Sequence, residues 1–345
     1  MKISNLNKSF SAINKINVSL VNIFNKAASF LNSISKKLGE NGYLFFGFLS
    51  NTLVFASMTS LKFIPNVDWS ICFIIRGVAY YFFGIVCSVI YQSEIQFYGR
   101  DLYYLNIRNL LMGVSSLFLQ YAVVVLPITI VWITVNSMPL FIFLVNYYIF
   151  SATISAKQII FLLVSLLGVL LIMDPSLFKK IFGIFSNAVT SNKQKENEDG
   201  QSITPFIQIV SVLFLASQVL AAYGISIIKK ANSINSLTVT LHLGLVCIIF
   251  GSFALFQRSD YIQIPSTYDL FLVFLVYGLG TFFPCIIFIH GTMVAKCQGK
   301  YSLTSYVNVF YSFLFSMVYE QKQLSLYEIL GFFITLFGLY KLMVK

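Results

Sequence analysis

The chain has 345 residues, of which 58% are hydrophobic, 17% are aromatic and only 10% are charged. Because about a quarter of the residues in a soluble domain are charged, this composition excludes the ordinary soluble classes and indicates an all-α integral membrane protein. The net charge of +11 does not indicate nucleic-acid binding, because the lysines and arginines lie between apolar runs and near the ends of the chain.

The first segment, residues 1–42, is rich in Asn, Ser and Lys and lacks the apolar core of a signal peptide. Apolar residues recur every three or four positions from Ile3 to Leu38. This spacing predicts an amphipathic helix on the membrane surface. The alternative is a polar tail whose periodicity arose by chance.

Ten apolar runs follow, and about 20 such residues are enough for a helix to cross a bilayer. They cover residues 43–61, 71–91, 104–124, 129–150, 156–173, 206–227, 236–255, 269–289, 302–319 and 327–343. The break at 125–128 rests on Pro127, and it also fits a kink in one long helix.

A polar segment, residues 174–205, divides these runs five and five. It has both charge signs and little apolar content, which predicts a flexible linker. The two halves are then residues 43–173 and 206–345. Counted over the ten spans, 15 Lys and Arg residues, Arg108 among them, lie on the side of the N-terminus, against 8 on the other side. The count predicts that both termini are cytosolic and that the linker is not.

The two halves resemble each other. When the sequence is shifted by 170 positions, Ser155 meets Ser325, and Gly168 meets Gly338. Since each half has an odd number of spans, the second half enters the membrane from the opposite side. This predicts two inverted five-helix repeats, an arrangement typical of secondary transporters.

Five stretches of the sequence carry a resemblance to a known family. They are IIRGVAYYFFG in the second span, RNLLMGVSSLFLQYA in the third, NSMPLF in the fourth, and VYGLGTFF and VNVFYSFLFSMVYEQKQLSLYEILGFFITLFG in the second half. Over about residues 43 to 343 the chain resembles the EamA-like carriers of the drug/metabolite transporter superfamily, relatives of the nucleotide-sugar carriers. The resemblance implies ten spans in two repeats, cytosolic termini and a glutamate at the elbow before the last span. Glu320 matches that glutamate, and Phe150 stands at the matching position of the first half.

Polar residues inside the spans are the candidates for substrate contact, because they are costly in lipid. Arg76 is interpreted either as an anion contact, as a cation that reaches the non-cytosolic surface, or as a structural residue bonded to a carbonyl or a loop acid. His242 is interpreted either as a residue that binds substrate or takes up a proton, or as one that hydrogen-bonds a neighbouring helix. Asn136 and Ser137 precede Pro139, which frees a backbone carbonyl one turn earlier. They either line a cavity or satisfy that carbonyl.

We expect a cavity lined by Tyr, Asn, Gln and Trp132 side chains, which suits an uncharged or amphipathic metabolite. The candidate substrate-binding residues are Asn51, Arg76, Gln120, Tyr121, Asn136, Ser137, Gln218, His242, Tyr306, Asn308 and Tyr311. The candidate structural or gating residues are Pro139, Gly168, Glu320 and Gly338.

The expected function is therefore secondary transport of a small organic metabolite by alternating access. A nucleotide-sugar or sugar-phosphate exchanger is the first alternative, and a receptor or scaffold with a carrier fold is the second. An intramembrane enzyme is disfavoured, because all 12 acidic residues lie in loops or near span ends. We expect a small-molecule substrate and membrane lipid as partners, and no nucleic acid, cofactor or metal. The sequence leaves a homodimer open.

Overall fold

The computed structural model describes residues 42–64, 67–91, 99–126, 128–150, 155–173, 205–231, 234–257, 265–295, 298–319 and 326–343, with Ser33, Ile95 and Gln321. Three predictions fall outside these residues. They concern the surface helix of the N-terminal segment, the linker that precedes Pro205, and the residue Glu320. The described residues form helices and turns, with no strand among them.

Among its described residues, the first half contains six α-helices and one 3-10 turn. They are α2 (Gly42–Thr59) with η2 (Ser60–Phe63), α3 (Trp69–Tyr91), α4 (Arg100–Val125), α5 (Ile128–Asn136), α6 (Met138–Phe150) and α7 (Ala156–Met173). The predicted fourth span is thus two helices, α5 and α6, that meet at Ser137.

The second half follows a similar order. It contains α9 (Pro205–Ile227) with η3 (Ile228–Lys230), α10 (Ser236–Phe256), α11 (Thr267–Leu272), the π-helical η5 (Val273–Leu279), α12 (Gly280–Val294), α13 (Gln298–Ser302), the 3-10 turn η6 (Leu303–Tyr306), α14 (Val307–Val318) and α15 (Leu326–Met343). The predicted ninth span is likewise divided, here among α13, η6 and α14.

Seven helical stretches of the described residues are long and apolar enough to cross a membrane. They are Gly42–Phe63, Trp69–Tyr91, Asp101–Val125, Ile130–Ile149, Ile209–Lys230, Ser236–Phe256 and Thr267–Val294. Two shorter apolar helices, Ala156–Gly168 and Ile329–Leu342, follow the same pattern.

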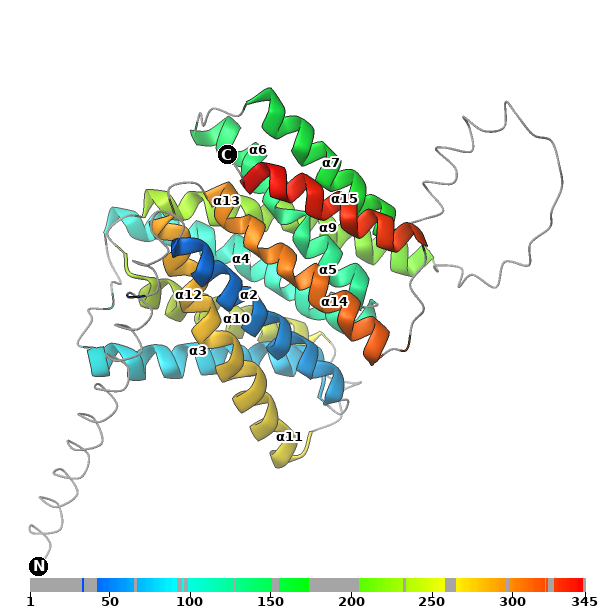
Figure 1. Ribbon diagram of the computed structural model, residues 1–345. Coiled ribbons are helices and arrows are strands. Elements are labelled where there is room, and N and C mark those ends of the chain that lie inside the picture. Colours follow the sequence, from blue (N-terminus) through cyan, green and yellow to red (C-terminus); the bar gives the residue numbers. More distant parts are fainter. Residues whose placement is uncertain are drawn as a thin grey trace, which may run out of the picture.

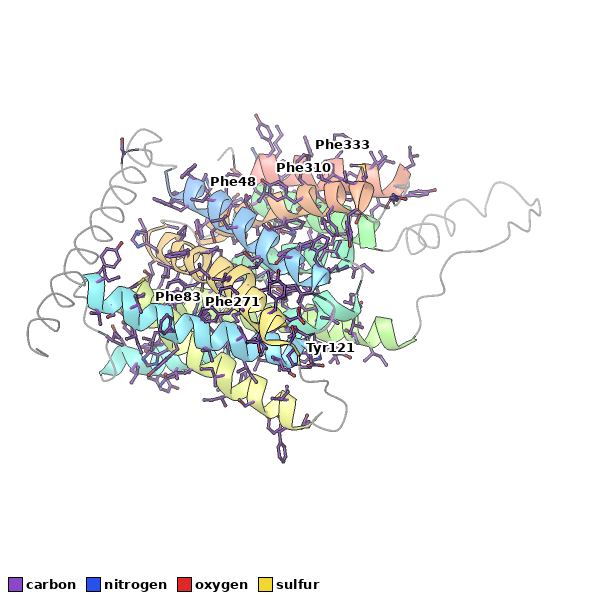
Figure 2. All side chains as sticks on the ribbon, turned by 90° about the horizontal axis from the view of Figure 1, so that it is seen from below. Phe48, Phe83, Tyr121, Phe271, Phe310 and Phe333 are labelled. Carbon is purple, nitrogen blue, oxygen red and sulfur yellow. The ribbon has the colours of Figure 1, made fainter. Side chains whose placement is uncertain are left out.

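The outer surface is strongly apolar. Phe48, Phe310 and Phe333 are 40%, 46% and 61% exposed, and Figure 2 shows these three side chains at the outer edge of the bundle. Many serines, threonines and asparagines are buried instead. A soluble protein has the opposite distribution, so this surface suits the hydrocarbon of a bilayer.

The sequence echo at the start of α7 has a local cause. The Ser155 hydroxyl accepts a bond of 3.3 Å from the backbone N–H of Gln158, and the Gln158 amide oxygen accepts one of 2.9 Å from the backbone N–H of Ser155. This reciprocal pair is a capping box, which satisfies backbone donors at a helix start. In the sequence, Ser325 and Glu328 have the same spacing where α15 begins.

Two helix pairs stand at opposite edges of the bundle. Figure 1 shows α7 and α15 side by side at one edge, and α3 with its neighbour α10 toward the other. Between them α4 packs on α9, α2 packs on α12, and α5 packs on α14. Each of these pairs joins one helix of the first half to one of the second.

Close glycine contacts hold α3 against α10. A Cβ atom on Gly77 would lie 2.8 Å from the backbone nitrogen of Ile248, and one on Gly244 would lie 3.0 Å from that of Tyr81. The two contacts are related by a single offset of 167 positions. Gly244 stands 167 positions after Gly77, and Ile248 stands 167 positions after Tyr81. The same offset relates two further contacts, Gly84 with Leu241 and Gly251 with Ile74. Because residue numbers rise along α3 as their partners fall along α10, the helices are antiparallel.

The pair α7 and α15 repeats this arrangement. A Cβ atom on Gly168 would lie 2.6 Å from the backbone nitrogen of Thr335, and one on Gly338 would lie 2.9 Å from that of Ser165. Here the offset is 170 positions (338 minus 168 and 335 minus 165). Only glycine allows backbones to approach so closely, as in other membrane helix pairs.

Candidate functional site: a central cavity with two arginines

A cavity of about 140 Å³ lies where the two halves meet. Its polar lining comes from both halves and consists of Ser50, Asn51, Arg76, Tyr80, Arg108, Ser115, Ser116, Gln218, Thr281, Cys285, Ser305 and Asn308. None of the described residues that line it is an aspartate or glutamate.

Arg76 lies on α3 and is buried, with 7% of its surface exposed. Its Nε donates a hydrogen bond of 3.0 Å to the Tyr80 hydroxyl, and its Nη1 lies 3.5 Å from the Tyr277 hydroxyl. The guanidinium carbon is 5.1 and 5.9 Å from the centres of these two rings, within the range of cation–π attraction. Arg76 therefore points into the protein and does not reach the membrane surface.

The two tyrosines pass this arrangement on to other helices. The Tyr80 hydroxyl donates to the Thr281 carbonyl at 3.0 Å, and the Tyr277 hydroxyl donates to the Gln120 side-chain oxygen. Tyr277 belongs to the π-helix η5, whose wider turn is a feature frequent at functional sites. Arg76 is thus fixed by a network that joins α3, α4 and the helices η5 and α12.

Arg108 is the second cation, and the sequence analysis missed it. It was counted with the cations on the N-terminal side because it lies only four residues inside the predicted third span, which began at residue 104. Helix α4 begins at Arg100 instead, so Arg108 lies two turns inside it and is 3% exposed. The face of α4 that carries Met112, Ser115 and Ser116 also carries Arg108 into the cavity.

The hydrogen bonds of Arg108 leave part of its side chain without a partner. Its Nη1 donates to the Asn109 side-chain oxygen at 2.5 Å, and Asn109 in turn donates to the Val239 carbonyl of α10 at 3.3 Å. The Nε atom of Arg108 is buried without a protein partner. Buried donors in proteins are ordinarily bonded, so this one indicates a place for a ligand group.

Three other cavity groups are in the same condition. The Trp132 indole nitrogen, the Ser305 hydroxyl and the Asn308 side-chain oxygen are buried without a protein partner. They come from α5, η6 and α14, so the groups available to a ligand surround the cavity from both halves.

Asn51 and Asn308 link α2 to the divided ninth span. The Asn51 amide nitrogen donates to the Gly47 carbonyl at 2.7 Å and to the Thr304 hydroxyl at 3.1 Å. The Asn308 amide nitrogen donates to the Asn51 side-chain oxygen at 3.5 Å. Gln218, on α9, also lines the cavity, and its amide nitrogen lies 3.3 Å from the Ser217 hydroxyl.

Of the eleven predicted substrate-binding residues, Asn51, Arg76, Gln218 and Asn308 line the cavity. Gln120 is buried behind Arg76, where it bonds Tyr277. The other six do not line it and make local contacts.

Asn136 and Ser137 occupy the break between α5 and α6. The Asn136 amide nitrogen donates to the Trp132 carbonyl, and the Ser137 hydroxyl donates to the Thr134 carbonyl at 2.6 Å. They satisfy carbonyls of α5 and not that of Val135, which stands four residues before Pro139, and neither residue lines the cavity. Pro139 is the second residue of α6, where its missing N–H does not interrupt the helix.

The remaining four predicted residues pack between helices. Tyr121 stacks edge-on against Trp69 with 5.4 Å between ring centres, and Tyr311 lies 5.5 Å from Phe55. The Tyr306 hydroxyl accepts from Ser165 at 3.4 Å. His242 is half-buried on α10, outside the cavity lining.

No protein-family model matches this sequence, and no curated protein matches it. Among solved structures, 16 chains match the fold. One of them, described as a crystal structure of protein, has a TM-score of 0.58 and 13% sequence identity, covering 88% of this chain and 98% of its own. At that identity the similarity concerns the fold alone.

Proposed function

We propose that this protein is a secondary transporter that moves a small organic metabolite across a membrane by alternating access. In this proposal ten helical spans form two inverted five-helix repeats, with both termini in the cytosol. The observation that carries it is an irregular turn in each of two corresponding segments beside the central cavity. One turn lies at Ser137 between α5 and α6, and the other is the 3-10 turn η6 between α13 and α14. Interrupted segments at corresponding positions of two halves typically mark the substrate site of such carriers.

The packing of the helices supports the inverted repeat. If α3 corresponds to α10 and α7 to α15, a two-fold rotation exchanges the helices of each pair. Such a rotation predicts that each glycine contact has a counterpart at a constant offset, as at Gly77 with Gly244 and at Gly168 with Gly338. The same rotation exchanges the contact between α4 and α9 with the contact between α12 and α2. The resemblance of the sequence to EamA-like carriers points in the same direction.

Uptake into proteoliposomes tests the proposal. The full chain would be reconstituted and offered labelled amino acids, organic acids, sugars, phosphate esters and nucleosides. We expect time-dependent accumulation of at least one class above that in empty liposomes. If the reconstituted, folded protein moves no class, the receptor or scaffold function replaces transport.

Two variants of α9 provide the control for that assay. Ala221 lines the cavity and Val212 is 65% exposed on the outer surface. Phenylalanine at position 221 fills the cavity, so uptake should stop, whereas Val212→Phe should leave it unchanged. Elution as a single species in detergent checks the folding of both. Ser116→Phe fills the same cavity from α4 if Ala221→Phe does not fold.

A further inference from the structure

We propose that the substrate is a small organic anion, whose carboxylate or phosphate group is bound by Arg108 beside the fixed charge of Arg76. This inference rests on the proposed transport function and narrows it to a substrate class. The neutral polar residues of the sequence suggested an uncharged or amphipathic metabolite. The presence of Arg108 in the cavity changes that expectation.

The first argument is the charge of the cavity. Arg76 and Arg108 both line it, both are more than nine-tenths buried, and both stay protonated because of their intrinsic basicity. No described acidic residue lines the cavity with them. Two cations at membrane depth are costly without an opposing charge. An anionic substrate supplies that charge when it binds.

The second argument separates the two arginines. Arg76 is held by Tyr80 and Tyr277, and it connects α3 to η5. Arg108 donates to Asn109, its neighbour on the same helix, so its own hydrogen bond joins no other helix. Its buried Nε has no protein partner. A structural arginine would bond across a helix interface, so Arg108 is better explained as a ligand contact.

The third argument is geometric. A guanidinium group presents parallel N–H donors that match the two oxygens of a carboxylate or phosphate. Ser115 and Ser116 lie about two turns along the same face of α4 and line the same cavity. Their hydroxyls and the unpartnered indole N–H of Trp132 supply neutral donors for the remaining oxygens. The volume of about 140 Å³ restricts the substrate to a small molecule.

Thermal unfolding of the purified full-length protein tests the anion site without requiring transport. The probes are matched pairs, glucose 6-phosphate with glucose and succinate with succinamide. A ligand that binds only the folded protein raises its unfolding temperature. We expect at least one anion to raise it and its neutral partner to leave it unchanged. Equal effects of the two members in both pairs, or no effect of either anion, would overturn the proposal.

Substitutions at Arg108 identify the contact. A charge-assisted hydrogen bond contributes about 1.5–3 kcal/mol, so Arg108→Gln should weaken binding of the stabilising anion by about 10- to 100-fold. Arg108→Lys keeps the charge and should bind more tightly than Arg108→Gln. Lys157→Gln, which removes an exposed cation at the start of α7, should bind as the unaltered protein does. Unchanged binding by Arg108→Gln would contradict the assignment.

Cys285 offers a second readout because it lines the cavity. The other four cysteines are first replaced by alanine, and the rates of modification by an anionic and a cationic methanethiosulfonate are measured. The ratio of the anionic rate to the cationic rate should be higher at Cys285 than at a small thiol free in solution. Arg108→Lys should keep this preference and Arg108→Gln should reduce it. A preference for the cationic reagent would overturn the proposal even if Arg108→Gln did not fold. Anion binding without uptake into proteoliposomes would instead contradict only the transport function.

Discussion

Many buried hydroxyl side chains of the described residues bond to carbonyls of their own helix. Thr134 donates to Ile130, Thr240 to Ser236, and Thr335 donates to the carbonyl of Gly331. Such bonds satisfy hydroxyl groups where no water is present. Arg108 and Trp132 keep buried donors without a protein partner. Buried hydroxyls without a partner also occur away from the cavity, at Thr59, Ser226 and Thr238. Arg108 and Trp132 are assigned to the substrate because they also line the cavity.

At this scale the Tyr277 hydroxyl gives a stability prediction. It bonds the Gln120 side chain and lies 3.5 Å from Arg76. Tyr277→Phe leaves the Gln120 oxygen buried without this donor, which costs about 1–3 kcal/mol. The thermal unfolding temperature in detergent should therefore fall. Tyr268→Phe, at a position that is 70% exposed, should leave it unchanged, and an equal fall in both variants would contradict the role of the network.

Glycine decides how closely the helices pack. A Cβ atom on Gly77 would lie 2.7 Å from the Gly244 carbonyl oxygen, and one on Gly244 would lie 2.8 Å from that of Gly77. Neither contact can be relieved by rotating a side chain, because both involve backbone atoms. The backbones of α3 and α10 must therefore separate if either residue is replaced.

Gly77→Ala and Gly244→Ala should each destabilise the protein by about 1–3 kcal/mol, as overpacking commonly does. Because the two positions correspond under the proposed rotation, their effects should be similar. Unfolding in a titration with a denaturing detergent measures both. Val89→Ala is the control, since Val89 lies on α3 and is 70% exposed. A loss at one position with none at the other would argue against equivalent packing.

For the whole molecule, the number of spans determines where the termini lie. Seven stretches meet the length and hydropathy expected of a membrane helix, whereas the proposal has ten spans. The difference lies in α7, α15 and the segment 298–318, which are short or divided. An even number of spans brings both termini to one side, and an odd number separates them.

Reporters fused at the two ends distinguish these topologies. With ten spans, a cytosol-specific fluorescent reporter should be active at both ends of the chain. A glycosylation acceptor in the 174–205 linker should then be modified, because five spans precede it. If the reporter is active at one end of the chain, and a glycosylation acceptor fused to the other end is modified, the chain does not have ten spans. The inverted repeat would then be ruled out as well.

The amino-acid sequence by itself determined the class of the protein and the positions of its helices. A charged fraction of 10% leaves a membrane as the solvent, and apolar runs of span length form helices there because each backbone group must bond within its own segment. The recurrence of Ser155 at Ser325 and of Gly168 at Gly338 was also visible, since these residues repeat at a fixed interval.

Only the tertiary structure decided which polar residues share a cavity. A residue's distance from the predicted end of a span does not tell which way it faces, so Arg108 was counted with the exposed cations, although α4 turns it inward. Tyr121, Tyr306 and Tyr311 looked equivalent to Asn51 and Asn308 in sequence, but they pack between helices away from the cavity. The rotation of each helix is set by contacts between segments far apart in the chain, such as Gly77 with Gly244, and such contacts are not written in any single segment.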